Sequence, residues 1–191
     1  MRIISGTAGG RRLVAPAGEK TRPTSDKIRG SLFNILMSRI ADANVLDLFG
    51  GTGAMALEAL SRGAAHAVIV DTDRQAIEAI RKNAQTVLGE DFRAQADIIK
   101  SDYKRALSAM SPVKFGLVFL DPPYMLTDAY SAAQSMLASR GMLAEDCVLV
   151  CERSRDAKVT YAEGFEIYDT REYGDTAVDF VRRVEDDQEG Q

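Results

Sequence analysis

The sequence predicts an α/β protein built around a mostly parallel, doubly wound sheet, and two features of the chain support this prediction. Apolar runs of strand length alternate with helical patterns from Asn44 to Glu152, which is typical of a parallel sheet. These runs are almost continuously apolar, as expected of strands covered on both faces. Two final strand-like segments have no helix between them, which predicts an antiparallel ending.

The N-terminal 40 residues stand apart from this alternation. The segments "RIIS" and "RRLVA" flank the turn-rich spacer "GTAGG", which predicts a short hairpin. The segment "RPTSDKIRGSLFNILMSRI" predicts a helix with its N-cap at Thr24 or Ser25 and an apolar stripe from Ile28 to Ile40.

The remaining elements follow in regular order. The expected strands are "NVLDLF", "AHAVIVD", "QADIIKSD", "FGLVFLD" and "DCVLVCE", and the expected helices are "TGAMALEALSRG", "RQAIEAIRKNAQTVLG", residues 103–110 and "TDAYSAAQSMLASRG". A closing hairpin of "GFEIYDTREY" and "TAVDFVRR" turns at Gly174 and Asp175. The sequence therefore predicts seven strands with an antiparallel strand at the edge. We expect an extension over 1–41, a main domain over 42–184 and a disordered acidic tail over 185–191.

Composition and charge indicate one soluble domain with a basic arm. The 191 residues are 46% hydrophobic and 27% charged, which is ordinary for a globular protein. We expect no signal peptide and no membrane span, and therefore a cytoplasmic location. The net charge of −4 is uneven, because residues 1–40 contain eight Lys and Arg against two acids, a net +6. Such an arm either attracts phosphates or is simply solvated.

Cysteine and histidine offer little for catalysis or metal binding. Cys147 and Cys151 face the same way along an expected strand, too far apart for a disulfide. His66 is the single histidine, in an expected surface turn, so a His/Cys zinc site is excluded and no metal is expected. Carboxylates, backbone groups and aromatic rings remain as the carriers of chemistry.

A glycine-rich loop follows the first expected strand, in "VLDLFGGTGAMALEAL". Ligands bind beyond the carboxyl ends of strands in such sheets, so this loop should line a pocket. The spacing Gly51-x-Gly53-x-x-Ala56, with Asp71 twenty residues after Gly51, matches a dinucleotide fingerprint. The same pattern also suits S-adenosylmethionine, because its ribose hydroxyls would donate hydrogen bonds to the Asp71 carboxylate.

Two further acids bear on the choice of cofactor. Asp47 ends the first expected strand, where a carboxylate repels a pyrophosphate but suits a ligand with an ammonium and a sulfonium. This favours S-adenosylmethionine over NAD. Asp102 ends the third expected strand, where it either accepts a hydrogen bond from the adenine amine or caps the helix that begins at Tyr103.

The stretch "LVFLDPPYML" places Asp121, Pro122, Pro123 and Tyr124 after the fourth expected strand. An exocyclic amine of a nucleobase is a poor nucleophile, and a carboxylate plus a backbone carbonyl can hold it for attack on a methyl group. Consecutive prolines fix the backbone and remove two donors, which leaves the Pro122 carbonyl able to accept. Tyr124 can stack on the base.

These motifs resemble a known group of enzymes. "DPPY" and "LDLFGGTG" match amino-directed S-adenosylmethionine-dependent methyltransferases. Together with "RIISGTAGGRRL" and "RPTSDKIRGSLFNIL", in this order over nearly the whole chain, they resemble the RsmD family. The resemblance implies a Rossmann-like fold with a reversed last strand and methylation of the N2 amine of a guanine in 16S ribosomal RNA. It also implies a substrate within the small subunit or its assembly intermediate, and we expect a monomer.

The resemblance also implies roles for individual residues. Asp47, Gly51 and Gly53 would contact the cofactor and Asp71 its ribose, and the same loop adds Phe49 and Gly50 while Asp102 serves the adenine. Asp121 to Tyr124 would contact the target base. The residues expected to hold RNA are Arg11, Arg12, Arg22, Pro23, Thr24, Lys27, Arg29 and Asn34. Where the family often has Glu and Lys, this chain has Asp71 and Thr72, which changes the local geometry.

Several alternative functions have specific features against them. A DNA amino-methyltransferase shares "DPPY" but usually needs a larger recognition domain than the basic arm provides. A protein glutamine methyltransferase usually has Asn where Asp121 stands. A non-catalytic RNA-binding assembly module would not need the acid and both prolines. A dehydrogenase would need an acid–base residue that no strand end supplies.

Overall fold

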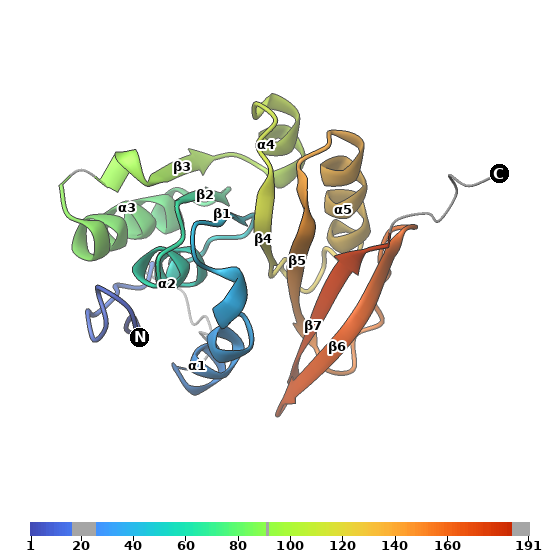
Figure 1. The fold of residues 1–191 in the computed structure, drawn as a ribbon, viewed down its shortest axis with the longest axis horizontal. Coiled ribbons are helices and arrows are strands. Elements are labelled where there is room, and N and C mark those ends of the chain that lie inside the picture. The colour runs from blue at the N-terminus through green and yellow to red at the C-terminus, as the bar shows by residue number, and fades with distance from the viewer. Residues whose placement is uncertain (17–25, 91, 185–191) are drawn as a thin grey trace.

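The computed structural model describes residues 1–16, 26–90 and 92–184 and shows one seven-stranded sheet (Figure 1). The strand order is β3-β2-β1-β4-β5-β7-β6. The strands are β1 (Asn44–Asp47), β2 (His66–Asp71), β3 (Ala96–Lys100), β4 (Phe115–Leu120), β5 (Leu143–Ser154), β6 (Phe165–Tyr173) and β7 (Thr176–Arg183). The helices are α1 (Asp26–Ile35), α2 (Ala54–Ser61), α3 (Arg74–Leu88), α4 (Tyr103–Ala109) and α5 (Ala129–Ser139), with 3₁₀ turns η1 (Met37–Arg39) and η2 (Phe92–Ala94).

The sheet is covered on both faces, as the continuous apolar strands predict. Side chains of α1, α2 and α3 form one core with alternate strand residues such as Ile69, and α4 and α5 form the second core with residues such as Val68. The five strands β3, β2, β1, β4 and β5 pair with one another in parallel. The expected doubly wound sheet is confirmed.

The closing hairpin and the antiparallel last strand are confirmed at the edge of the sheet, but the last strand is not the outermost one. β7 is antiparallel to both β5 and β6 and lies between them, so the edge strand is β6 and the reversed strand is interior. The reason lies in the side chains, because β7 is buried from Ala177 to Val181 whereas most of β6 is exposed. Gly174 makes the tight turn with φ +63°.

The predicted N-terminal hairpin is present, although it is too short and irregular to form regular strands. An antiparallel bridge joins Arg2 and Arg12, backbone hydrogen bonds run from Ile3 N to the Arg11 carbonyl at 2.9 Å and from Gly10 N to the Ile3 carbonyl at 2.8 Å, and the turn packs against α2. The buried Glu58 carboxylate accepts hydrogen bonds from the backbone N–H groups of Ile4 at 2.6 Å and Ser5 at 3.0 Å. Glu58 thus satisfies two backbone donors in the turn region of this hairpin.

Three smaller predictions have mixed outcomes. The α1 stripe is buried at Leu32 and Phe33, whereas Ile35 is exposed, and the predicted cap at Thr24 or Ser25 lies outside the described residues. Cys147 and Cys151 are buried free thiols. His66 was expected in a surface turn but begins β2, half-buried, with its Nε2 3.7 Å from the Asp97 carboxylate.

Within the described ranges, none of the helices combines the length and the apolar character needed to cross a membrane.

A buried carboxylate ties β5, β6 and β7 together. Asp179 is fully buried on β7 and accepts hydrogen bonds from Arg153 Nε at 2.6 Å, Tyr161 Oη at 2.6 Å and Thr170 Oγ1 at 2.7 Å. Burial alone would raise the pKa of Asp179, but the hydrogen bonds from these three partners outweigh it and lower the pKa. The ionised form is therefore the stable one.

We expect Asp179→Ala to lower the free energy of unfolding by about 3–5 kcal/mol, because it leaves the mostly buried Arg153 without its counter-charge. Urea unfolding measures this directly. Asp156→Ala is the control, since Asp156 is exposed and pairs with Arg155 at 3.5 Å, and we expect a change below about 1 kcal/mol. Equal losses in both variants would contradict the assignment.

Candidate active site

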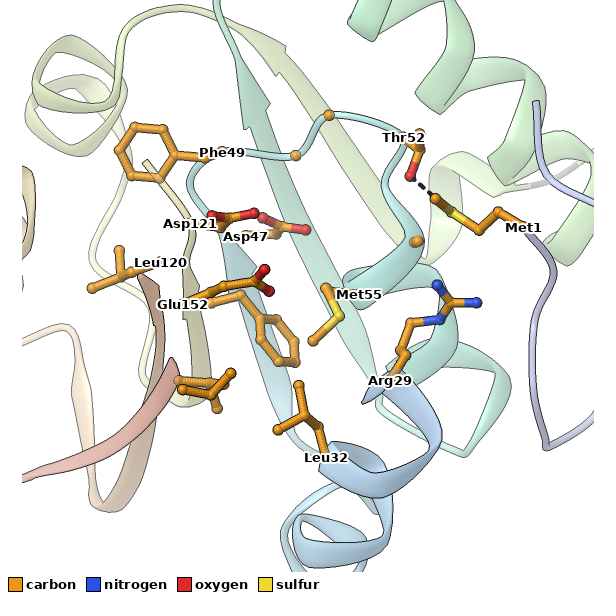
Figure 2. Close-up of a pocket in the computed structure, with 16 residues that line it drawn as sticks. Met1, Arg29, Leu32, Asp47, Phe49, Thr52, Met55, Leu120, Asp121 and Glu152 are labelled. Carbon is orange, nitrogen blue, oxygen red and sulfur yellow. Dashed lines mark hydrogen bonds between the residues drawn. The ribbon is translucent and has the colours of Figure 1, made fainter. Parts of the chain in front are cut away.

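Strand register brings three carboxyl groups to one place. Asp47 stands opposite Phe119 of β4, which in turn stands opposite Val150 of β5. Side chains along a strand alternate, so the residues two positions further on, Asp121 and Glu152, point to the same face of the sheet. Figure 2 shows the carboxyl groups of Asp47, Asp121 and Glu152 gathered in one pocket.

The pocket lies at the carboxyl end of the sheet, on the face covered by α1 and α2. Its volume is about 140 Å³, and the glycine loop forms one wall. Apolar side chains form the opposite part, namely Leu32, Met55, Phe119, Val150 and Val178. A polar, acidic end beside an apolar floor is typical of a binding site for a small organic group.

The glycine loop, residues 50–53, is held in a conformation that needs glycine. A Cβ at Gly50 would lie 2.6 Å from the Ile69 side chain, so no larger residue fits there. Gly51 and Gly53 have φ of +54° and +75°, in the left-handed region. A Cβ at Gly51 would meet no atom within 4 Å, so the backbone at this position is open to an approaching ligand.

The two acids at the ends of β2 and β3 already contact the backbone. Asp71 Oδ2 accepts a hydrogen bond from Gly51 N at 2.8 Å, and Asp71 Oδ1 accepts one from Asp73 N at 2.8 Å. Asp102 Oδ1 accepts one from Arg105 N at 3.0 Å and so caps α4. Asp71 therefore positions the glycine loop. Of the two roles predicted for Asp102, the structure shows the helix cap.

Burial and mutual repulsion change the acidity of the pocket carboxyl groups. Burial, followed by the neighbouring Asp71, raises the pKa of Asp47 to about 7. Asp121 as a residue is exposed at the pocket mouth, yet its carboxyl group lies among protein atoms. This burial, then the charges of Glu152 and Asp47, raise the pKa of Asp121 well above its ordinary value. The pocket therefore favours binding of hydrogen-bond donors or positive charge.

Two groups of the Asp-Pro-Pro-Tyr segment bear on substrate binding, namely the Pro122 carbonyl and the Tyr124 ring. The Pro123 carbonyl accepts a hydrogen bond from Leu126 N at 2.8 Å. The Pro122 carbonyl accepts none from the part of the chain that the structure describes. Tyr124 is 80% exposed, so its ring has a face available to a ligand.

Apart from Arg29, the predicted RNA-binding residues fall into three groups. Arg12, Lys27 and Asn34 are exposed. Arg11 donates to the carbonyls of Thr86 and Val87 at the end of α3, at 2.6 and 3.0 Å. The third group, Arg22, Pro23 and Thr24, lies outside the described residues.

Arg29 differs from a surface cation. Its side chain is fully buried in the pocket wall, and its guanidinium donates to the Arg2 carbonyl and to the Asp26 carboxylate, the latter at 3.0 Å. Arg29 therefore joins α1 to the N-terminal segment, a role that its position on an amphipathic helix did not indicate.

Glu152 was missing from the predicted site. It ends the apolar run "CVLVCE" of β5 and lines the pocket beside Asp121. The signal was present in the sequence, because an acid after an apolar strand also marks Asp47, Asp71 and Asp121. What the sequence did not contain was the pairing of β5 with β4, which places Glu152 level with Asp121.

Asn83 connects the glycine loop with the N-terminal segment. This buried side chain on α3 accepts a hydrogen bond from Val14 N at 2.8 Å. It donates to the carbonyls of Val14 and Thr52, both at 2.9 Å. One amide thus fixes both segments to the same helix.

Known proteins resemble this chain over most of its length. The family described as Conserved hypothetical protein 95 matches residues 1–182. "Putative rRNA methyltransferase YlbH" from Bacillus subtilis (strain 168) is 36% identical over 186 residues, which cover 96% of this chain and 99% of that protein. "Ribosomal RNA small subunit methyltransferase D" from Escherichia coli (strain K12) is 36% identical over 152 residues, covering 80% of this chain and 74% of that protein.

Solved structures confirm the Rossmann-like fold. One described as "Putative methyltransferase yhhF from Escherichia coli" superposes with a TM-score of 0.82 at 30% identity, covering 96% of this chain and 98% of that chain. A more distant one, "SMU.776, a putative methyltransferase complexed with SAH", has a TM-score of 0.62 at 14% identity and covers 82% of this chain and 48% of that chain.

The raised pKa of Asp47 predicts a pH-dependent cost in stability. The folded pKa of about 7 exceeds the ordinary value of 3.8, so the folded state binds more protons than the unfolded state between these values. Stability therefore falls as pH rises through this window. We expect Asp47→Asn to be more stable than wild type by about 1–3 kcal/mol at pH 8 and nearly equal at pH 4.

Urea unfolding at both pH values measures this difference. The control is Asp42→Asn, an exposed position where φ of +58° suits asparagine. An advantage of Asp47→Asn that stays the same at pH 4 and pH 8 would contradict the raised pKa.

Proposed function

This chain belongs to the RsmD family, and we propose that it transfers a methyl group from S-adenosylmethionine to the exocyclic N2 amine of a guanine in 16S ribosomal RNA. The observation that carries the proposal is the gathering of Asp47, Asp121 and Glu152 in one pocket bordered by the glycine loop, with Asp121 opening the Asp-Pro-Pro-Tyr segment. The names of the relatives, which include an rRNA methyltransferase of the small subunit, support ribosomal RNA as the substrate class.

The pocket residues suit S-adenosylmethionine better than a dinucleotide. A buried carboxyl at Asp47 disfavours the pyrophosphate of NAD and suits a ligand with positive charge. Gly51 leaves the backbone open where a ligand would lie. We propose that the loop from Phe49 to Gly53 holds this cofactor, with Asp47 facing its charged end and Asp71 and Asp102 bordering its adenosine.

The cofactor would supply an electrophilic methyl group, whose bond to the sulfonium sulfur breaks, leaving a neutral thioether, as the amine nitrogen bonds to it and loses one proton. Asp121 accepts one N–H of the amine and the Pro122 carbonyl accepts the other, which directs the nitrogen lone pair into the pocket. The prolines make both acceptors rigid. Burial, then the charges of Glu152 and Asp47, raise the pKa of Asp121, which makes its carboxylate a stronger base for the departing proton.

RNA would be held by the N-terminal region and by Tyr124. Arg12, Lys27 and Asn34 are exposed and can contact phosphates and sugars, whereas Arg29 positions the N-terminal segment from within. The target base must leave its stack to reach the pocket. The exposed ring of Tyr124 provides the surface on which it can stack. We propose that residues 1–41 act as the RNA-binding extension of the catalytic domain over 42–184.

The decisive experiment is transfer of labelled methyl from S-adenosylmethionine to small ribosomal subunits of cells that lack the native enzyme. We expect one labelled N2-methylguanine per subunit in nucleoside analysis. Duplex DNA and naked 16S RNA serve as competing substrates in parallel reactions. Labelling of DNA alone would identify a DNA amino-methyltransferase, and cofactor binding without any labelling would indicate a non-catalytic RNA-binding module.

We expect Asp121→Ala to lower the rate of methyl transfer by about 10²–10⁴-fold, because it removes the acceptor that orients the amine. Cofactor affinity, measured by calorimetry, should change little, since Asp121 serves the amine. Asp128→Ala is the matched control, an exposed acid just before α5. Equal losses of rate and cofactor affinity in Asp121→Ala would overturn its assigned role.

A further inference from the structure

We propose that Glu152 selects guanine by accepting a hydrogen bond from its N1–H, beside the amine that Asp121 holds. This inference rests on the proposed function and adds the residue that distinguishes guanine from adenine and cytosine. Glu152 lines the same pocket as Asp121 and points toward it from β5 (Figure 2). The alternation of β4 and β5 places both residues on one face, at the same level of the sheet.

The hydrogen-bonding edges of the bases differ in the atom next to the amine. In guanine the N2 amine is followed by N1–H, so two donors lie side by side. In adenine and in cytosine the amine is followed by a ring nitrogen that carries a lone pair. Two carboxylates side by side therefore match guanine, whereas adenine or cytosine would bring a lone pair against a negative charge.

The end of β5 is held firmly enough to present Glu152 in one position. The Glu152 carbonyl accepts a hydrogen bond from Tyr130 Oη at 2.5 Å. The next residue, Arg153, is fixed to the buried Asp179 carboxylate. Specificity requires such support, because an acceptor that can move by 1 Å adapts to the wrong base as well.

The negative charges of the pocket carboxylates also favour a base with two adjacent donors. Glu152 contributes to the repulsion that raises the pKa of Asp121. Two donors of guanine would relieve this repulsion, since each adds a hydrogen bond to one of the two carboxylates. A base with one donor would leave the second carboxylate facing a lone pair.

The test uses 2-aminopurine, which keeps the N2 amine of guanine but has a lone pair at N1. Small subunits are reconstituted with either guanine or 2-aminopurine at the nucleotide that the methyl-transfer assay identifies. We expect wild type to prefer guanine strongly. In Glu152→Gln the amide can donate to N1, so the preference for guanine should fall by about 10- to 100-fold. Glu145→Gln, an exposed acid on the same strand, should behave as wild type.

Each outcome separates the inference from the proposed function. Glu152→Asp keeps a carboxylate and should keep the guanine preference at a lower rate, which covers the case in which Glu152→Gln does not fold. If wild type methylates guanine and Glu152→Gln retains the full preference, Glu152 does not select the base. If Glu152→Asp loses the preference, the inference is likewise overturned. No methylguanine with wild type would refute the proposed function itself.

Discussion

The register between β1, β4 and β5 is the constraint on which the site depends. Side chains alternate with a period of two along each strand, so a slip of one residue in β4 would turn Asp121 toward α4 and α5. The ladder pairs Asp47 with Phe119 and Phe119 with Val150, and these apolar partners are buried against α1 and α2. Burial of the apolar residues therefore fixes the placement of the acids two positions further along.

Placing several carboxyl groups in one pocket has a cost in stability, and the fold offsets it elsewhere. Asp47 and Asp121 both have raised pKa values, so their charged forms are disfavoured in the folded state. Asp179 shows the opposite behaviour, because three donors hold its charge inside the sheet. Both arrangements involve buried aspartate side chains. The number of hydrogen-bond donors around each carboxylate decides whether it destabilises or stabilises the folded state.

Local sequence patterns predicted the elements and the acids at strand ends, because apolar periodicity and chain order are local properties. They failed where the answer depended on contacts between distant segments. The interior place of β7 depends on its burial on both faces, which only the assembled sheet reveals. The burial of Arg29 depends on the carbonyl of Arg2. Glu152 was overlooked because its significance arises from the neighbouring strand and not from its own run.

The side-chain amide of Asn83 restricts the sequence in a way that its burial alone does not. Both of its N–H donors are used, one by Val14 and one by Thr52, while its oxygen accepts from Val14. A carboxylate of the same shape could accept but could not donate, so aspartate would leave two carbonyls facing a negative charge. One rigid planar group therefore sets the distance between the N-terminal segment and the glycine loop. A replacement side chain would have to match both the length of asparagine and its pair of donors and one acceptor.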